Sequence, residues 1–365
     1  MWQWFNFLAA QVPSGKTVLK INLDETAICL YQGGGKGNIL LSKKRPRGEA
    51  EVVQRVPRSR RRAYLTHVAF VCDQAEFQPL LPQVVIGNER VLPAAAMPAL
   101  RASLPSNVRL IRQKSSWNNS TLCAIIVRML ALALGPHRER FQPVLLLDTV
   151  RLHFNQVVLN ACNACGVWPI LVPAKTTWLL QPLDTHVFRA FKDRLRKAYQ
   201  KARIQAATHD LNVQQFMPCL YEAIRITMDE PDWSSSFSEN GFGQLQAQVK
   251  ESIRRELAMD QPLCIPSARP TLEQLQCVFP KRTVVPTASL WRPFDPPSAP
   301  SFARSSASSA RVVFPRVGAV AVLGRTRSQT QQLRVSDGSV AAAAPLLRAA
   351  RGQPLRPRRP TAGGQ

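Results

Sequence analysis

Three acidic residues stand inside, at the end of or shortly after apolar, strand-like runs, and these runs constrain the fold more than any other feature. Asp24 lies inside LKINLDETAICLY, Asp148 ends PVLLLD, and Asp184 follows the run WPILVP through a proline-bounded turn. PVLLLD is short and continuously apolar, which is typical of a central strand buried on both faces. A carboxylate in such surroundings is costly unless it is paired or bound to a cation.

Strand-like and helical patterns alternate along the chain, and this alternation predicts an α/β domain. The apolar runs predict strands at residues 17–25, 26–32, 63–73, 80–88, 143–148 and 168–173. Apolar residues at helical spacing predict helices at residues 120–135, 154–165, 186–206, 213–228 and 243–257, with Gly166 ending the second of these.

The composition changes beyond about Cys264. Residues 265–365 are rich in Pro, Ser, Ala and Arg, with little periodicity, so we expect a largely disordered basic tail. The whole chain carries 48 Lys and Arg against 23 Asp and Glu, a net charge of +25. Such an excess favours a polyanionic partner, nucleic acid before membrane. Because the tail holds much of this charge, the argument for nucleic acid has to rest on the site.

Several classes of protein and site are disfavoured by short segments. The opening MWQWFNFLAA has no basic leader and no cleavage-type ending, so we do not expect a signal peptide. The apolar run 122–135 is too short for a membrane span and contains Arg128, so we expect a soluble intracellular protein with no membrane partner. Cys162 and Cys165 form the one CxxC of the sequence, and without a second ligand pair we expect reduced thiols rather than zinc.

Asp184 has two interpretations at this point. A helix that opens with Pro182, Leu183 and Asp184 has an ordinary explanation, because Asp caps free N–H groups and suits the helix dipole. Alternatively, the three acids converge on divalent metal. Hard oxygen ligands suit Mg²⁺ or Mn²⁺, and two ions about 4 Å apart can hold both the attacking and the leaving oxygen of a phosphodiester.

Three sequence blocks, INLDET, LLLDTVRLH and LVPAKTTWLLQPLDTHVFRAFK, resemble the DDE superfamily endonuclease domain of pogo- and jerky-type transposases, within the wider mariner group. The likeness covers residues 15–258 and is most specific at residues 171–192. It implies a ribonuclease H-like fold, which is a mixed five-stranded sheet flanked by helices. It also implies that Asp24, Asp148 and Asp184 are the catalytic residues and the ligands of two Mg²⁺ or Mn²⁺ ions.

The second and third blocks depart from the family pattern. Thr149 replaces the usual Asn of the second block, while His153 is retained, and VPAKTTW replaces the usual LPxNTT of the third. We expect Thr149 and His153 to lie just behind the metal ligands. Thr149 can still form a hydrogen bond, and His153 either orients the Asp148 region or packs at a helix start. The helix-turn-helix region expected ahead of such a domain is not found before Asp24.

Two basic segments are candidates for DNA contact. Arg60, Arg61 and Arg62 lie in a stretch with many charges, which either follows DNA phosphates or is a solvated loop. Lys192 lies on the predicted helix after Asp184. We expect the apolar face of this helix, including Phe191, to pack on the sheet, and its polar face either to approach DNA or to be solvated.

Three functions are compatible with the sequence. The preferred one is a metal-dependent endonuclease and transposase that hydrolyses a DNA strand and transfers the freed 3′-OH to target DNA. The second is a catalytically inactive, domesticated nucleic-acid-binding protein of the same fold, and the third is an unrelated basic scaffold. The presence of all three acids favours the first. DNA is the expected partner and the nucleus the expected location, and homo-oligomer formation is left open.

Overall fold

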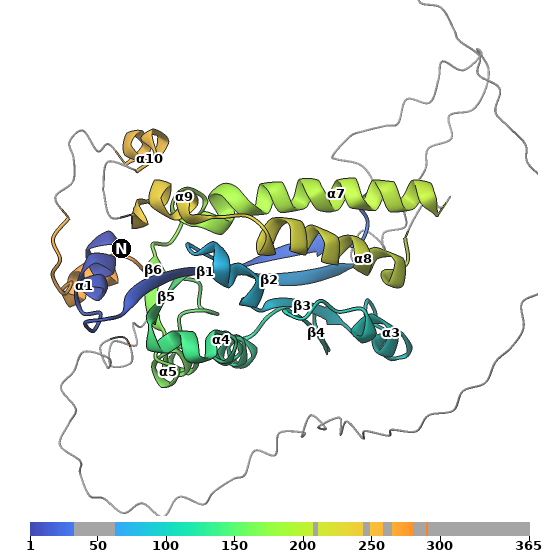
Figure 1. Cartoon of the computed structure of the whole chain (residues 1–365), viewed down its shortest axis with the longest axis horizontal. Coiled ribbons are helices and arrows are strands. Elements are labelled where there is room, and N and C mark those ends of the chain that lie inside the picture. The colour runs from blue at the N-terminus through green and yellow to red at the C-terminus, as the bar shows by residue number, and fades with distance from the viewer. Residues whose placement is uncertain (33–62, 207–210, 244–248, 258–264, 280–289, 291–365) are drawn as a thin grey trace, which may run out of the picture. The chain divides into compact units, whose positions relative to one another are not determined.

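The computed structural model describes residues 1–32, 63–206, 211–243, 249–257, 265–279 and 290, all of which belong to one unit, Met1–Ser301. At the centre of this unit is a mixed sheet of six strands (Figure 1). They are β1 (Thr17–Cys29), β2 (Tyr64–Cys72), β3 (Gln83–Asn88), β4 (Val108–Gln113), β5 (Phe141–Asp148) and β6 (Trp168–Val172). Their order across the sheet is β4-β3-β2-β1-β5-β6.

The direction of the strands places most of the sheet's carboxyl ends together. β2 runs antiparallel to β1 and to β3, whereas β1 and β5, β5 and β6, and β3 and β4 pair in parallel. The carboxyl ends of five strands therefore lie at the same edge of the sheet. In open α/β sheets this is the edge outside which ligands bind.

The mixed α/β class predicted from the sequence is confirmed, with six strands in place of five. The additional strand is β4, which the sequence did not predict. A second difference concerns the two runs predicted at residues 17–25 and 26–32. These residues form one 13-residue strand, β1, as far as Cys29, because the polar residues at its centre continue the ladder with β2 instead of making a turn.

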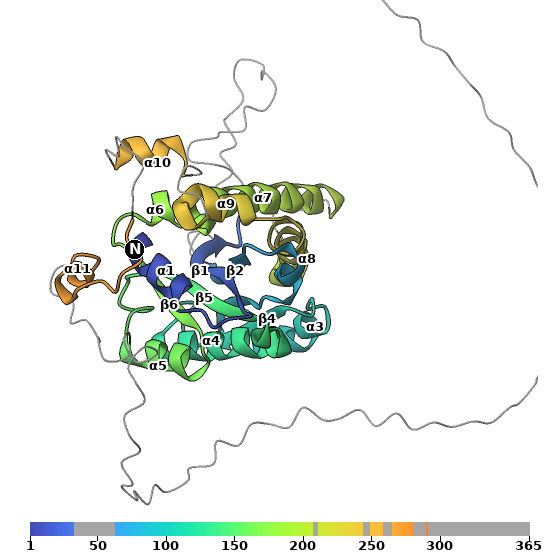
Figure 2. The same ribbon diagram turned by 60° about the vertical axis from the view of Figure 1, so that its left-hand side comes forward.

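Helices cover both faces of the sheet. In both views α4 and α5 lie on one face, and α7 and α8 lie on the other (Figures 1 and 2). The α-helices are α1 (Trp2–Ala10), α3 (Met97–Ala102), α4 (Ser120–Leu134), α5 (Gln156–Ala164), α6 (Thr177–Leu180), α7 (Phe188–Gln205), α8 (Val213–Ile224), α9 (Ser234–Phe237), α10 (Glu251–Glu256) and α11 (Leu272–Gln276). Short 3₁₀ segments are η1 (Ala75–Leu80), η2 (Ala94–Ala96) and η3 (Gly135–Glu139), and π-type segments are η4 (Leu183–Val187), η5 (Arg225–Asp229) and η6 (Ser238–Phe242).

Helix α4 has the boundaries that its sequence predicts. The Asn119 side chain accepts a hydrogen bond from the Leu122 N–H at 2.9 Å, and Gly135 ends the helix with a φ of 44°. The segment Ser120–Glu139 is long and apolar enough to cross a membrane by length and composition alone. In the structure, Ile126 and Leu130 of this segment are buried in the core of the unit.

The helix after Asp184 packs as its apolar spacing predicts. Phe188, Phe191 and Leu195 of α7 are buried, and the face continues to Tyr199. The ring of Phe191 lies 5.2 Å from the imidazole of His67 on β2, measured between ring centroids. Helix α7 is therefore held against the sheet by its apolar face.

Part of the predicted tail belongs to the described unit. Residues 265–279 include α11, and the carbonyl groups of Ile265 and Ala268 accept hydrogen bonds from the side chains of Asn6 and Gln3 on α1. The Ala174 N–H also donates to the carbonyl of Val278 at 3.1 Å. Apart from Leu290, the rest of the predicted tail lies outside the described residues.

Candidate active site

Asp24 and Asp148 lie level with each other on neighbouring strands. The parallel pairing of β1 and β5 runs from Thr17 opposite Phe141 to Asn22 opposite Leu146. Asp24 and Asp148 each lie two residues beyond the last pair of this ladder, on neighbouring strands. Asp148 is also the last residue of β5, so its side chain is at the carboxyl-end edge of the sheet.

Hydrogen bonds from the turn after β6 bring the third acid to the same place. The Leu183 N–H donates to Oδ1 of Asn22 on β1 at 2.8 Å, and Nε2 of Gln181 donates to the carbonyl of Leu23 at 3.2 Å. The other end of the Asn22 amide, Nδ2, donates to the carbonyl of Leu146 on β5 at 3.3 Å. Asn22 thus joins β1, β5 and the first residue of η4, and Asp184 is the next residue of η4.

The three carboxylates act on one another electrostatically. Burial, followed by the charge of Asp184 and that of Asp148, raises the pKa of Asp24 well above its usual range. Asp184 is more open to solvent, yet partial desolvation and the charge of Asp148 raise its pKa, against a hydrogen bond from Thr177 and the charge of Lys192. Carboxylates that disfavour one another's ionisation leave a site short of positive charge, which a divalent cation supplies.

The capping interpretation of Asp184 can be compared with these contacts. Segment η4 begins after Pro182, and no side chain caps its first residues. The Asp184 carboxylate instead accepts a hydrogen bond from Thr177 of α6. Asp184 thus lies in the first turn of η4, where an acid suits the helix dipole, but no side chain caps this segment.

The donor set suits a hard cation shared between pairs of acids. Within the described ranges, no three side chains of His, Cys, Asp or Glu are arranged so that they could hold a single metal ion. Asp24, Asp148 and Asp184 would therefore have to hold divalent metal in pairs, and the metal would supply the positive charge that these carboxylates lack. All these donors are carboxylate oxygens, which Mg²⁺ and Mn²⁺ prefer.

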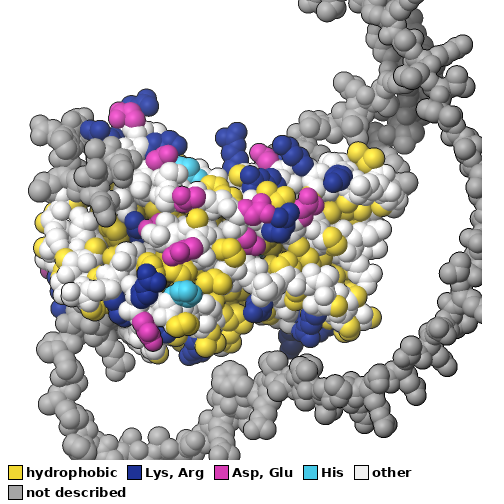
Figure 3. Space-filling model, viewed as in Figure 1, with side chains coloured by type: hydrophobic (Ala, Val, Ile, Leu, Met, Phe, Trp, Pro, Cys, Tyr) yellow, Lys and Arg dark blue, Asp and Glu magenta, His cyan; other side chains and the backbone are white. Residues whose placement is uncertain are grey.

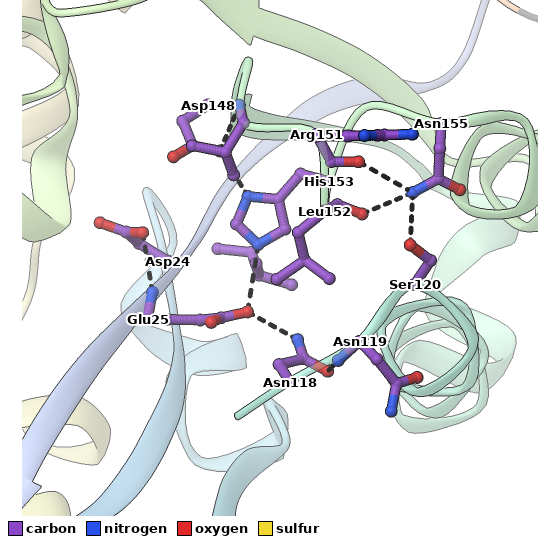
Figure 4. A network of polar contacts seen from close by, with 12 residues as sticks. Asp24, Glu25, Asn118, Asn119, Ser120, Asp148, Arg151, Leu152, His153 and Asn155 are labelled. Carbon is purple, nitrogen blue, oxygen red and sulfur yellow. Dashed lines mark hydrogen bonds and ion pairs between the residues drawn. The ribbon is translucent and has the colours of Figure 1, made fainter. Parts of the chain in front are cut away.

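His153 lies between Asp148 and Glu25, the residue after Asp24 on β1, as Figure 4 shows. Its Nδ1 donates to Oδ1 of Asp148 at 2.5 Å, and its Nε2 donates to Oε1 of Glu25 at 3.2 Å. The side chain of Asn118 also donates to Glu25, at 2.6 Å. Burial disfavours the charged imidazole, but the hydrogen bonds and charges of Asp148 and Glu25 outweigh it and raise the pKa of His153 to about 10. His153 is therefore a charged bridge between the two acids at neutral pH.

The two residues predicted behind the metal ligands differ in their contacts. His153 is 2% exposed and touches Asp148 directly. Thr149 is equally buried, but its hydroxyl has no hydrogen-bond partner among the described residues. The hydrogen bond expected of Thr149 is therefore not formed within the described part of the protein.

Of the predicted DNA contacts, Lys192 can be placed. It is exposed on α7, its ammonium group lies 5.8 Å from the centre of the Phe188 ring, and its charge lowers the pKa of Asp184. Figure 3 shows Lys and Arg side chains, with acidic ones among them, on the side of the molecule formed by α7. Arg60, Arg61 and Arg62 lie outside the described residues.

Four residues of this site were not identified from the sequence: Asn22, Glu25, Asn118 and Gln181. One of them had a usable signal, because Asn22 is a polar residue in the middle of an apolar run and a buried amide needs partners. Glu25 and Asn118 could not be paired in advance, since 93 residues separate them and only the fold shows that they meet.

The sequence matches one known family model over part of its length. Residues 67–234 match the family model of the DDE superfamily endonuclease, a stretch that includes Asp148 and Asp184 and begins after Asp24. No curated protein matches the sequence. Among solved structures, a chain of the "Mos1 transposase paired-end complex with left transposon end" is 12% identical, with a TM-score of 0.31. That alignment covers 66% of this chain and 62% of the transposase chain, less than two thirds of its length.

Proposed function

We propose that this chain carries the catalytic domain of a DDE-type DNA endonuclease and transposase, which cuts phosphodiester bonds with divalent metal. The observation that carries this proposal is that Asp24, Asp148 and Asp184 lie near enough to act on one another's ionisation. The family match over residues 67–234 supports it independently. DNA is the substrate in this proposal, and the nucleus is where the protein acts.

Asp24, Asp148 and Asp184 would hold the metal, Mg²⁺ or Mn²⁺. When two such ions are bound, they activate the attacking oxygen and stabilise the leaving one. The protein's own contribution is to fix the carboxylates in place. The charged His153 holds Asp148 through one N–H and Glu25 through the other, so that the Asp148 carboxylate keeps one orientation. Asn22 holds the backbone beside Asp184 against both strands.

Thr149 favours a second candidate function. A buried hydroxyl without a partner among the described residues occupies the place of the family's Asn, directly beside the ligand Asp148. Such a change is expected where selection for catalysis has relaxed. The second candidate is therefore a domesticated DNA-binding protein that retains the fold and the acids but no longer cuts.

Nicking of supercoiled plasmid by the full chain tests the first function and separates it from the second. We expect nicking with Mg²⁺ or Mn²⁺, none with EDTA, and none for Asp24→Asn or Asp148→Asn. Asp193→Asn is the matched control, because Asp193 is an exposed acid on α7 that pairs with Arg196 away from the three aspartates. Nicking by Asp148→Asn at the native rate would exclude the proposed site, and DNA binding without nicking by the native chain would favour the second function.

A further inference from the structure

A separate pocket of about 550 Å³ lies at the carboxyl-end edge of the sheet. It is formed by Ala27 on β1, Tyr64 and Thr66 on β2, residues 88–90 after β3 and residues 114–117 after β4. Pockets that hold small ligands have volumes of about 300–1,000 Å³. None of the three aspartates lines it, so the pocket is not part of the site described above.

The pocket carries two exposed aromatic side chains on a fixed backbone. Trp117 is 73% exposed and Tyr64 is 44% exposed. The loop bearing Trp117 is held by the Ser116 hydroxyl, which accepts from the Asn88 N–H at 3.1 Å, and by Gln113, whose Nε2 donates to the Trp117 carbonyl at 2.6 Å. An indole displayed in this way offers a flat face on which a nucleic-acid base can stack.

The charge of the pocket suits phosphate. Arg90 and Lys114 line it, and neither forms an ion pair with any other described residue. Its one acid, Glu89, lies 3.5 Å from Arg112, which partly neutralises it. An exposed aromatic face and two cations in one pocket match the chemistry of a nucleotide, which has a base to stack and phosphates to bind.

The pocket adjoins the proposed cutting site. Asn118, next to Trp117, donates to Glu25, and Glu25 is next to Asp24. Along β1, Ala27 lies three residues beyond Asp24, a distance of about 10 Å at the usual rise of a strand. The side chains of Asp24 and Ala27 point to opposite faces of β1, so a DNA strand positioned at the aspartates would reach the pocket around the carboxyl-end edge of the sheet.

We propose that this pocket binds an unpaired nucleotide of a single DNA strand, with Trp117 stacked on the base and with Arg90 and Lys114 bound to the flanking phosphates. The location of that strand beside the cut rests on the proposed endonuclease function. Duplex DNA keeps its bases inside the helix, where an indole reaches them only if a base is flipped out at a cost in energy. The pocket therefore selects single-stranded or frayed DNA.

The test measures binding of the full chain to a fluorescent single-stranded oligonucleotide and to the same sequence as a duplex, in EDTA at fixed salt. Trp117→Ala should weaken single-strand binding by roughly 5- to 150-fold, the range for removal of one stacked base, and leave duplex binding within about twofold. Trp117→Phe should recover most of the single-strand affinity. Leu132→Ala, which removes another highly exposed apolar side chain, is the matched control and should bind like the native chain.

Equal weakening of single-strand and duplex binding in Trp117→Ala, or no weakening of either, would overturn the proposal. Displacement of the oligonucleotide by a mononucleotide at equal concentration would overturn the assignment to a strand and indicate a free-nucleotide site. The assay is run in EDTA and needs no cutting, so it measures the pocket without the endonuclease activity. Failure of the pocket proposal can therefore be distinguished from failure of the endonuclease proposal.

Discussion

Asn22 is the residue on which the geometry of the site depends most directly. Its amide satisfies one backbone group at the start of η4 and one on β5, and it is fully buried. Replacing it with Ala removes both bonds and leaves two buried backbone groups without partners. Because a buried polar group left without a partner costs about 1–3 kcal/mol, we expect Asn22→Ala to lower the free energy of unfolding by at least that amount.

Urea denaturation measures this decrease, and plasmid nicking should fall with it at temperatures where the variant is still folded. The matched control is Gln205→Ala, which removes an exposed amide at the end of α7. If Asn22→Ala unfolds at the native urea concentration, Asn22 does not connect the strands to η4 as described.

His67 gives the protein a predicted sensitivity to acid. Burial lowers its pKa from 6.5 to about 4, and a hydrogen bond with Gln83 opposes this only in part. Below pH 6.5 the unfolded chain takes up a proton at His67, whereas the folded protein does so only near pH 4. Stability is therefore present above the unfolded pKa and is lost as the pH falls from 6.5 to 4, by on the order of 3 kcal/mol from this residue.

His67→Phe should remove that part of the acid sensitivity. Nδ1 of His67 has no partner among the described residues, and Gln83 retains its bonds to the backbone of Phe70, so little is lost at pH 7. The measurement is the free energy of unfolding of both proteins at pH 7 and pH 5. If the difference between them is the same at both pH values, His67 is not the titrating group.

At the scale of elements, helix α7 is the rigid support for the preceding segment η4, which contains Asp184. Phe191 is fully buried between this helix and β2. Large-to-small changes of buried aromatic residues cost about 3–5 kcal/mol, so Phe191→Ala should destabilise the protein by that amount in urea melts. Lys192→Ala, one residue along on the exposed side, should leave stability nearly unchanged and weaken DNA binding. A silent Phe191→Ala would mean that α7 does not support η4.

Elements with an uninterrupted apolar pattern could be predicted from the sequence, and short amphipathic ones could not. β5 was identified from a short continuous apolar run, and α4 from a helical apolar pattern through its 15 residues. β4 was missed because its sequence, VRLIRQ, mixes apolar and charged residues at the sheet edge, where only part of the strand is buried. Helix α1 was missed for a different reason: its apolar residues match a helix, but its packing partners, such as Pro169, lie far away in the chain.

The same distinction applies to the site. Asp24 and Asp148 stand out because each interrupts or ends an apolar pattern, and Asp184 stands out because its sequence block resembles the DDE endonuclease family; their catalytic role stays a prediction. Their supporting contacts join β1 to segments more than 90 residues away, and no local pattern encodes such a pairing. Local sequence thus indicates the candidate aspartates, whereas the residues that form hydrogen bonds around them become visible only in the folded structure.

At the scale of the whole molecule, the large positive charge predicts strongly salt-dependent DNA binding. Replacing Arg60, Arg61 and Arg62 with Ala removes three of the 48 basic side chains from one segment. If these side chains bind phosphates, the slope of log affinity against log salt should become shallower by about 0.9 for each phosphate that is no longer neutralised. Titrations with duplex DNA at several salt concentrations measure this slope, and an unchanged slope would leave the three arginines as a solvated basic segment.

The position of β1 limits how this protein can be shortened. The stretch that matches the endonuclease family begins at residue 67, inside β2, and so excludes β1, which lies between β2 and β5 in the sheet. A fragment cut to residues 67–234 would lose its central strand along with Asp24. Two half-sheets would remain, and the backbone groups of β2 and β5 that now pair with β1 would be exposed as open edges. Open, apolar strand edges pair with other chains. A fragment of residues 67–234, chosen from the family match alone, is therefore expected to aggregate.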